Sequence, residues 1–466
     1  MSVLDAKIAA ARAVGGLARR AGRGGGTSLP GKVLTRLEPR AIERLASRLP
    51  EGCAVISSTN GKTTTAAMAA AVIERTGTTL VHNRAGANMA GGVASTLLQA
   101  ARRGGGIEGQ LGLFEVDEFW LDRVVPELHP RAVLLGNLFR DQLDRYGELE
   151  TIADRWAATV AGLPADAAVA CNADDPLIAD LGRHHPATRY FGVEDPAMAT
   201  AEMQHASDSK HCRRCGHAYQ YDAIYLGHLG VYRCPNCGQH RPAPTVFARD
   251  VGLHGTRSAS FELHSPAGSV GIELPLPGLY NVYNALGAAT LCLGLGVSLE
   301  AIAAGLGSVS PAFGRAERVA IGEHELSILL IKNPAGANEI VRTLVLEAGE
   351  LDLLAILNDR TADGRDISWI WDADFEMLAG RLRHVTCAGT RAAELGLRLK
   401  YAGLSEDQLS VIPALAPALD SALQGSAGER LFALPTYTAL LELRQELERR
   451  GHVSAFWSHE PAGAGR

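Results

Sequence analysis

The run CAVISSTNGKTTT at residues 53–65 decides how this chain is expected to fold. Its apolar start, Cys53–Ile56, has the composition of a buried strand, and an alanine-rich segment with a helical pattern follows the polar residues. A strand, a glycine-containing turn and a helix in this order form the frame of a phosphate-binding loop. At such a junction, free backbone N–H groups and the helix N-terminus favour a negatively charged ligand.

The residue types in this run define the expected contacts to a nucleotide. Gly61 lets the backbone turn close to a phosphate, Lys62 can reach the β- and γ-phosphates, and the Thr63 hydroxyl can bind Mg²⁺. The predicted ATP-binding loop comprises Thr59, Asn60, Gly61, Lys62, Thr63 and Thr64. We therefore predict ATP and Mg²⁺ as ligands, with Lys62 acting on the transferred phosphoryl group.

The start of the run departs from the general phosphate-loop pattern. The first glycine of that pattern is absent, and Ser57 and Ser58 stand near its place. The alternative is an ordinary strand–helix turn with one exposed lysine. A Gly-Lys-Thr-Thr-Thr sequence at a strand–helix junction favours the phosphate-binding interpretation.

Length, composition and charge limit the kinds of protein that this chain can be. A chain of 466 residues, 47% of them hydrophobic, is expected to form roughly two to four domains with large cores. The net charge of −6 gives no sign of a nucleic-acid or membrane binder. No apolar run reaches the length of a bilayer-spanning helix, and the N-terminus lacks the pattern of a signal peptide. We therefore expect a cytoplasmic protein.

Residues 1–44 form a basic lead in which apolar residues recur at helical spacing. Five lysines and arginines stand against a single acidic residue, Asp5, among the first 25 residues. Two alternatives remain open for this lead. It forms either a helix on a membrane surface or a solvated helix packed on the main domain.

The eight cysteines fall into two groups. Four are scattered through apolar stretches and are expected in the core: Cys53, Cys171, Cys292 and Cys387. The others follow the pattern C-x₂-C-x₁₈-C-x₂-C: Cys212, Cys215, Cys234 and Cys237. A glycine follows each pair, and four thiolates at this spacing predict a structural, tetrahedral Zn²⁺ site. Two disulfides are the alternative, which a reducing compartment disfavours.

Beyond the loop, short apolar runs alternate with helical patterns. Strands are expected at residues 111–116, 132–136 and 167–171, and helices at 64–75, 89–102 and 151–163. This alternation predicts an α/β fold with a mostly parallel, doubly wound sheet. A second alternating block begins near residue 320, with expected strands at 326–331, 353–357, 384–388 and 431–434.

These patterns divide the chain into domains. We predict an ATP-binding domain over residues 45–318 and a smaller C-terminal α/β domain over residues 319–466. The polar, cysteine-bearing stretch at residues 203–243 interrupts the first domain and is expected to be an inserted zinc ribbon.

Polar side chains stand at the edges of several predicted elements. Glu115 ends a predicted strand, where an open α/β sheet binds its ligands, and its carboxylate can hold Mg²⁺ directly or through water. Asn137 follows the next strand and is a candidate nucleotide contact. Asn281 is a candidate for the base or ribose and Arg315 for the γ-phosphate. Capping or surface roles are the alternatives for these residues.

Six motifs in order resemble the Mur ligase family, whose members form amide bonds in peptidoglycan assembly through an acyl-phosphate. Between residues 45 and 318 these motifs are TNGKTTT, FEVDE, NLFRDQLDRYG, NADDP, GLYNVYNALGA and FGRAE. The ordered set is more specific than any single motif. The resemblance implies a Mur ligase-like ATPase domain in which Lys62 and Glu115 take part in catalysis.

Three further features resemble the MurT branch of this family: the four-cysteine insertion, the run NRAGANM at residues 83–89, and C-terminal strings such as DGRDISW. Members of that branch are ligase-like subunits of lipid II isoglutaminyl synthase and work with a glutaminase of the GatD type. The resemblance covers nearly the whole chain. It implies ATP-dependent amidation of the α-carboxyl of D-glutamate in the lipid II stem peptide, at the inner face of the membrane.

Two positions depart from the general pattern of the family. Many Mur ligases place a Mg²⁺-binding histidine where this chain has Gln142. Many also use a carbamylated lysine, but Lys210 is the only lysine between Lys62 and Lys332. The resemblance therefore implies that Mg²⁺ relies on Thr63, Glu115 and water.

The source of nitrogen is expected to be a partner protein, because Cys387 falls in a predicted strand and the chain has no persuasive glutaminase site. The resemblance implies that an aspartate of this subunit completes the partner's Cys–His pair, and the motif DGRDISW gives Asp366. Three nearby aspartates compete with it: Asp363, Asp372 and Asp374. Capping of a helix that starts near Ile367 is the alternative role for Asp366.

Two other functions remain open. A ligase that adds an amino acid, related to folylpolyglutamate synthase, would show amino-acid-dependent ATP turnover without a glutaminase. A zinc-ribbon nucleic-acid binder with an ATPase motor is disfavoured by the acidic net charge and the lack of a long basic stripe. We therefore expect no nucleic-acid partner.

Overall fold

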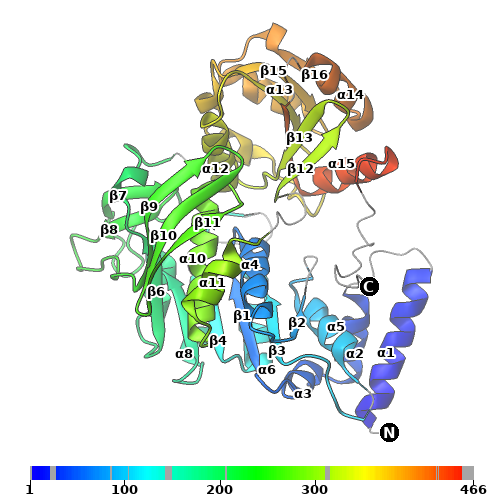
Figure 1. The fold of residues 1–466 in the computed structure, drawn as a ribbon, viewed down its shortest axis with the longest axis vertical. Helices are drawn as coiled ribbons and strands as arrows, with labels where there is room; N and C mark the ends of the chain where they lie inside the picture. Colours follow the sequence, from blue (N-terminus) through cyan, green and yellow to red (C-terminus); the bar gives the residue numbers. More distant parts are fainter. Residues whose placement is uncertain are drawn as a thin grey trace. The chain divides into compact units, whose positions relative to one another are not determined.

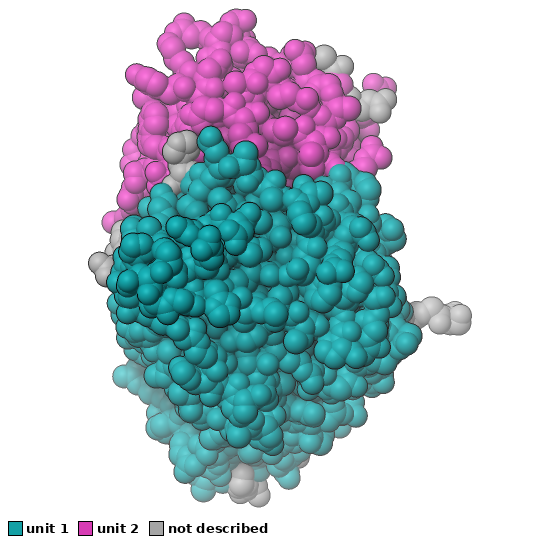
Figure 2. Space-filling model, turned by 90° about the vertical axis from the view of Figure 1, so that its left-hand side faces the viewer, with its two compact units in different colours: residues 1–140, 146–254, 258–310 teal, residues 141–145, 255–257, 311–466 magenta. Residues whose placement is uncertain are grey.

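The computed structural model describes residues 3–20, 28–83, 87–102, 104–141, 149–204, 207–309, 315–426, 428 and 430–453. The chain divides into two compact units, shown as a ribbon in Figure 1 and as coloured surfaces in Figure 2. Unit 1 comprises residues 1–140, 146–254 and 258–310, and unit 2 comprises residues 141–145, 255–257 and 311–466. Each unit contains a large sheet of its own.

Unit 1 is built on a nine-stranded sheet with the order β11-β10-β9-β6-β5-β4-β1-β3-β2. Its strands are β1 (Cys53–Ser57), β2 (Leu80–His82), β3 (Leu111–Glu115), β4 (Ala132–Leu135), β5 (Ala168–Asn172), β6 (Thr188–Val193), β9 (Val246–His254), β10 (Ser258–Ser265) and β11 (Gly268–Leu274). Neighbours from β2 to β9 are parallel, and β10 pairs antiparallel with β9 and β11. The predicted mostly parallel α/β sheet is confirmed.

Alternate side chains of the central strands point to different layers of helices, as the pleat of a strand requires. Val133 and Leu135 of β4 belong to one buried core. Leu134 points the other way, and a Cβ added at Gly287 would lie 3.1 Å from its side chain. Helices of the first core are α2 (Leu29–Leu37), α3 (Ala41–Ala46), α5 (Ala90–Ala100), α6 (Leu121–Leu128), α8 (Leu149–Ala161) and α9 (Pro176–Gly182). The second layer contains α4 (Lys62–Glu74), α10 (Leu279–Gly294) and α11 (Leu299–Leu306).

The basic N-terminal lead begins with α1 (Val3–Arg20), which packs into unit 1. Leu4, Ile8 and Ala11 are buried in the same core as α2. Lys7 Nζ donates to Glu38 Oε2 at 3.0 Å, and Arg12 Nη2 donates to a backbone carbonyl of α5 at 2.7 Å. Of the two alternatives for the lead, the structure therefore shows a helix packed on the main domain.

The cysteine-bearing insertion lies between β6 and β9. It contains the short 3₁₀ helix η1 (Pro196–Met198) and an antiparallel hairpin of β7 (Gln220–Leu226) and β8 (Leu229–Arg233). The hairpin forms a separate two-stranded sheet. The main sheet resumes at β9, so the insertion adds to unit 1 without changing the order of its strands.

Unit 2 contains a six-stranded sheet with the order β12-β13-β17-β14-β15-β16. Its strands are β12 (Arg315–Ile321), β13 (His324–Leu329), β14 (Leu351–Ile356), β15 (Leu382–Ala388), β16 (Leu409–Val411) and β17 (Arg430–Pro435). Its helices are α12 (Pro334–Val345), α13 (Ala392–Tyr401), α14 (Leu415–Gly425) and α15 (Tyr437–Arg449), with 3₁₀ turns η2 (Ser368–Trp371), η3 (Phe375–Leu378) and η4 (Glu406–Gln408). Among the described strands of this sheet, β12 and β13 pair antiparallel and the other neighbours pair parallel. The predicted separate C-terminal α/β domain is confirmed.

The junction between the units falls earlier in the structure than in the predicted division at residues 318 and 319. Compact unit 2 takes up the chain from residue 311, and β12 starts at Arg315. Since β12 pairs with β13, residues 315–318 form part of the C-terminal sheet.

Candidate phosphate-binding site and cysteine cluster

The segment after β1 turns sharply into α4 at the carboxyl end of the parallel strands of unit 1. Gly61 has a φ of 85°, in the left-handed region that side chains disfavour. A Cβ added there would lie 2.0 Å from Asn284 Oδ1, so a larger residue would also collide with α10. Helix α4 begins at Lys62, and its first backbone N–H groups have no partner within the helix. The loop therefore has the shape and the dipole direction that suit a phosphate.

Lys62 is a buried cation rather than the exposed lysine of an ordinary turn. Its side chain is 9% exposed, and Nζ donates to Glu118 Oε2 at 2.7 Å. Burial by itself lowers the pKa of Lys62, but the carboxylates of Glu118, Asp117 and Glu115 outweigh burial and raise the pKa to about 12. Lys62 is therefore charged at neutral pH, as an interaction with phosphate requires.

The two residues predicted to bind Mg²⁺ lie next to each other. Thr63 Oγ1 donates to Glu115 Oε1 at 3.1 Å, and Asn88 Nδ2 donates to the same oxygen at 3.4 Å. Asn83 fixes the backbone of Glu115, because it accepts from Glu115 N at 2.8 Å and donates to Glu115 O at 2.7 Å. A hydroxyl and a carboxylate in this arrangement are hard oxygen ligands of the kind Mg²⁺ takes, with water and phosphate completing its shell.

Asn137 follows β4 and is bonded to the backbone of the phosphate loop. Asn60 N donates to Asn137 Oδ1 at 2.9 Å, and Asn137 Nδ2 donates to Asn60 O at 3.1 Å. Thr59 is held in the same way, since its N–H donates to Asn137 O at 2.9 Å and its Oγ1 accepts from Phe139 N at 3.2 Å. Asn137, through its side-chain amide and its backbone carbonyl, thus fixes the shape of residues 59–60.

Two serine hydroxyls hold the start of the loop where the general pattern has glycine. Ser57 Oγ donates to Val116 O at 2.8 Å. Ser58 Oγ donates to Asn60 O at 2.6 Å and accepts from Asn137 N at 3.1 Å. At the position of the missing glycine, the hydroxyls of Ser57 and Ser58 therefore stabilise the start of the loop.

Asn281 reaches the loop only indirectly. It is 3% exposed, and its Nδ2 donates to Pro277 O at 2.7 Å. Asn284 Nδ2 donates to Asn281 Oδ1 at 3.0 Å, and Asn284 Oδ1 in turn accepts from Thr65 Oγ1 at 3.2 Å. The structure thus places Asn281 behind Asn284, which is the residue of α10 that borders Gly61.

Three further residues of the predicted site are placed differently. Thr64 is buried in the first turn of α4. Arg315 begins β12 in unit 2, and its side chain lies outside the described part of the chain. Gln142, at the position of the missing histidine, also lies outside the described residues.

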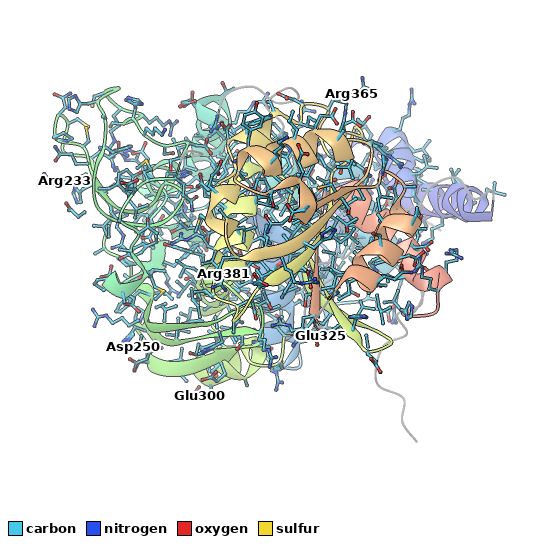
Figure 3. The ribbon with its side chains drawn as sticks, turned by 90° about the horizontal axis from the view of Figure 1, so that it is seen from above. Arg233, Asp250, Glu300, Glu325, Arg365 and Arg381 are labelled. Atoms are coloured by element: carbon cyan, nitrogen blue, oxygen red, sulfur yellow. The ribbon has the colours of Figure 1, made fainter. Side chains whose placement is uncertain are left out.

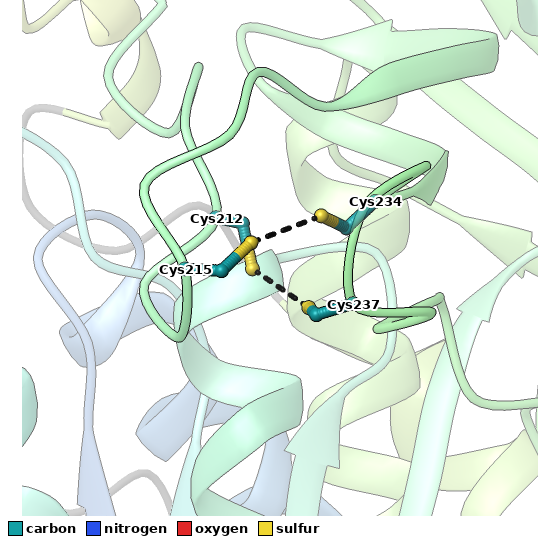
Figure 4. Close-up of side chains that lie close together, drawn as sticks. All are labelled: Cys212, Cys215, Cys234 and Cys237. Carbon is teal, nitrogen blue, oxygen red and sulfur yellow. Dashed lines mark hydrogen bonds between the residues drawn. The ribbon is translucent and has the colours of Figure 1, made fainter.

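The four cysteines of the insertion converge on one point, with all four sulfurs within 4.8 Å of one another (Figure 4). Cys212 and Cys237 have their sulfurs 3.5 Å apart, and Cys215 and Cys234 have theirs 3.4 Å apart. The glycine after each pair has a φ of 72° or 74°, which allows the tight turn of a metal knuckle. All four are free thiols, and tetrahedral Zn–S bonds of about 2.3 Å place sulfurs at similar separations. The cluster can therefore hold a metal ion.

Asp366 lies in unit 2 and is exposed. Ser368 N donates to Asp366 Oδ1 at 2.8 Å at the start of η2, and this backbone bond, with a second from the Ser368 side chain, lowers the pKa of Asp366. Figure 3 shows the side chains from above and labels Arg365, the preceding residue. Asp366 is thus bonded locally to the first residue of η2, and its ionised carboxylate lies at the surface.

Two of the three competing aspartates are held by internal contacts. Asp363 is 6% exposed and accepts from Thr438 N at 2.7 Å. Asp374 Oδ2 accepts from Asn338 Nδ2 at 2.9 Å, and Asp374 N donates to Asn338 Oδ1 at 2.7 Å. These bonds tie both carboxylates to helices of unit 2, so Asp366 is the more accessible group.

Comparison with known proteins decides the family. The model of the Mur ligase middle domain matches residues 56–292, and that of the MurT ligase C-terminal domain matches residues 330–440. Subunit MurT of lipid II isoglutaminyl synthase from Streptococcus pneumoniae is 32% identical over 92% of this chain and 93% of its own length. The chain belongs to the MurT family. MurT of Staphylococcus aureus strain N315 is also 32% identical, over 93% of this chain and 96% of its own.

Solved structures agree with the MurT assignment at the level of the fold. A pseudomurein peptide ligase type C from Methanothermus fervidus superposes with a TM-score of 0.67 at 22% identity, covering 87% of this chain and 80% of that one. The MurF ligase of Thermotoga maritima, solved in complex with ADP, superposes with a TM-score of 0.62 at 13% identity, covering 90% and 85%. This MurT-family chain therefore has the Mur ligase fold. Within the described residues, none of its helices combines the length and hydropathy needed to cross a membrane.

Sequence reasoning missed several residues of this MurT phosphate site. Asn83 and Asn88, which hold Glu115, stand inside the run that marked the MurT branch, but nothing in the run indicated their partner. Glu118 stands in the run FEVDE three residues after Glu115, and the structure pairs it with Lys62. The only available signal was the density of polar residues after each strand.

Proposed function

We propose that this chain is the ATP-dependent subunit of a lipid II isoglutaminyl synthase. In this role it is a carbon–nitrogen ligase that amidates the α-carboxyl of D-glutamate in the lipid II stem peptide, giving D-isoglutamine. The observation that carries the proposal is the charged, buried Lys62 beside the Thr63–Glu115 pair, in a chain related to MurT subunits over nearly its whole length.

The reaction has two steps. A carboxylate oxygen of the substrate attacks the γ-phosphorus of ATP, the bond from that phosphorus to the bridging oxygen breaks, and ADP leaves. Neutral ammonia then attacks the acyl carbon, the C–O bond to phosphate breaks, and the nitrogen loses a proton. Carboxylate, ATP and ammonia thus become amide, ADP and phosphate. The first step is needed because a free carboxylate has no good leaving group.

The residues of the loop have defined roles in the first step. The Lys62 ammonium attracts the terminal phosphates and neutralises charge on the transferred group. Thr63 and Glu115 would hold Mg²⁺, which neutralises and orients the phosphates when bound. Asn137 keeps residues 59–60 in the shape that presents their backbone to the nucleotide.

The cysteines outside the metal cluster support an external source of ammonia. Cys387 is fully buried, and burial raises the pKa of its thiol to about 12. Burial likewise raises the pKa of Cys53 and of Cys292 to about 12, and it also raises that of Cys171. Such thiols stay protonated and do not act as nucleophiles at neutral pH. We therefore propose that a GatD-type glutaminase supplies ammonia and that Asp366 completes its Cys–His pair.

The remaining features complete the proposal. The cysteine cluster would bind Zn²⁺ in a structural role, because four thiolates leave no position open for substrate or water. Lipid II is membrane-linked, so the subunit would work in the cytoplasm at the inner face of the membrane.

Oxygen-18 transfer tests the proposed acyl-phosphate step. Lipid II labelled in the α-carboxyl of D-glutamate is incubated with the chain, ATP, Mg²⁺ and ammonium chloride, without any glutaminase. One labelled oxygen is expected in the released phosphate for each amide formed. Amide formation with unlabelled phosphate would refute the step, and a requirement for an amino acid in place of ammonia would favour the amino-acid ligase.

A further inference from the structure

The segment Asn137–Arg140 contacts the cysteine-bearing insertion as well as the phosphate loop. Arg140 N donates to Asp208 Oδ2 at 2.9 Å, and the Arg140 guanidinium forms an ion pair with the same carboxylate. The Asp208 side chain is only 3% exposed, whereas that of Arg140 is 37% exposed, so the carboxylate is the buried partner of the pair. Asp208 lies in the insertion, four residues before Cys212. The insertion therefore contacts Arg140 at the end of this segment, and Asn137 at its start is bonded to the phosphate loop.

His228 makes the second contact between the insertion and this segment. It lies at the turn between β7 and β8, is fully buried, and packs its ring on Phe139 with centroids 4.5 Å apart. Its Nε2 lies 3.4 Å from Asp175 Oδ2, and the same oxygen accepts from Leu138 N at 2.9 Å. Phe139 is thus packed against His228, and the backbone of Leu138 is held by the Asp175 carboxylate beside that histidine.

Contacts inside the insertion connect this turn to the cysteine cluster. Tyr221 OH lies 3.0 Å from His228 O and 3.1 Å from Ser209 O, within hydrogen-bond distance of both, so it joins the turn to the segment that leads to Cys212. Strand β8, which starts at Leu229, ends immediately before Cys234. A metal bound by the cysteines would therefore hold the segment that carries Asp208, through Cys212, and the end of strand β8, through Cys234. His228 lies at the turn before that strand.

We infer that the insertion is a positioning element for the phosphate loop, acting through His228 and Asp208 on the Asn137–Arg140 segment. Both residues contact the segment, and the segment contacts the loop. Asn137 is bonded to Asn60 and Phe139 N to Thr59, so a shift of the segment moves the loop. A ligand binds more weakly when only a fraction of molecules holds the competent shape, in inverse proportion to that fraction. The inference rests on the proposed function in one respect, that this loop binds ATP.

A matched pair of variants tests the inference. Asp208→Ala removes the carboxylate that holds Arg140. Asp180→Ala removes a carboxylate of α9 that pairs with Arg213 at 3.5 Å and with Arg214 at 2.7 Å, both in the insertion. These two ion pairs do not involve the Asn137–Arg140 segment. Both variants break an arginine–aspartate contact between the insertion and the rest of unit 1. They differ in whether that contact reaches the phosphate loop.

The measurement is the dissociation constant of ATP and of ADP, by calorimetry on the full zinc-loaded chain, with metal content and thermal midpoint recorded alongside. We expect Asp208→Ala and His228→Ala to weaken both nucleotides roughly 2- to 30-fold, the range found for couplings of this kind. His228→Phe keeps a ring on Phe139 and is expected to recover most of the affinity. Asp180→Ala is expected to bind both nucleotides as the parent chain does.

Two outcomes would overturn the inference. Unchanged dissociation constants in folded Asp208→Ala would show that the contact serves stability alone, and this variant decides the matter even if His228→Ala fails to fold. Equal weakening in Asp180→Ala would show a general effect of loosening the insertion. If the parent chain itself does not bind ATP, the proposed function fails, which is a distinguishable result.

Discussion

Replacing Lys62 by methionine separates the two tasks of its ammonium group, which attracts phosphate and neutralises buried carboxylates. Lys62 Nζ lies 2.7 Å from Glu118 Oε2, with side chains 9% and 7% exposed. Removing one partner of a buried pair costs about 3–5 kcal/mol, because the other charge stays behind without compensation. We therefore expect Lys62→Met to lose ATP turnover and to lower the free energy of unfolding by about that amount.

The pKa of Lys62 gives the sign of the pH dependence. Folding raises this pKa from 10.5 to about 12. A pKa raised by folding contributes stability that is complete below the unfolded pKa and is lost as the pH rises through the folded pKa. Each pKa unit corresponds to about 1.4 kcal/mol, so this contribution is about 2 kcal/mol. The stability gap between the parent and Lys62→Met is thus expected to be constant near neutral pH and to shrink between pH 10.5 and 12.

Urea unfolding followed by circular dichroism measures the free energies, and release of ADP measures turnover. The control is the double variant Lys62→Met/Glu118→Gln, in which the stranded carboxylate is gone. Most of the lost stability is expected to return in the double variant, while ATP turnover is not. Parental stability in Lys62→Met would refute the buried ion pair, and parental turnover would refute the assignment of the loop.

Three further predictions concern other parts of the chain. Asn137→Ala removes both amide bonds to Asn60 and is expected to raise KM for ATP roughly 5- to 150-fold, from about 1–3 kcal/mol of lost interaction; steady-state kinetics with unchanged KM would contradict this. Cys237→Ser is expected to release zinc and lower the thermal midpoint, which elemental analysis and calorimetry check, and full metal retention would count against the four-thiolate site. Asp366→Asn is expected to impair amidation driven by glutamine while sparing amidation driven by added ammonium, with Asp363→Asn as a comparison for structural damage. Equal loss with both nitrogen sources would remove Asp366 from the partner's triad.

Much of the fold follows from hydrophobic patterning that a single sequence displays. Strands β1, β3, β4 and β5 are short runs buried on both faces, so their apolar residues are continuous and easy to recognise. The antiparallel strands β10 and β11 of unit 1 were not predicted, because a sheet region with one solvated face has a weaker hydrophobic pattern. In β10, buried and partly exposed residues alternate along Ser258–Ser265, and several of its residues are polar.

The residues of the site could be predicted where they stand in a short motif or at the end of a predicted strand. Contacts between residues that are distant in sequence could not be predicted. The loop at residues 59–64 and the carboxylate of Glu115 stand at strand ends, where the topology of the sheet brings them together. The pairing of Lys62 with Glu118, 56 residues away, depends on the turn after β3. The contacts of Asp208 and His228 with the Asn137–Arg140 segment depend on how the insertion folds back, which no local pattern encodes.

Mass spectrometry of lipid II tests the central claim most directly. Lipid II with an unmodified D-glutamate is incubated with ATP, Mg²⁺ and ammonium chloride, once with the parent chain and once with Lys62→Met. With the parent chain, fragment ions are expected to show the small mass decrease of OH replaced by NH₂, located on the α-carboxyl of D-glutamate and accompanied by equimolar ADP. Unmodified lipid II in the presence of folded, ATP-binding parent chain would contradict the account.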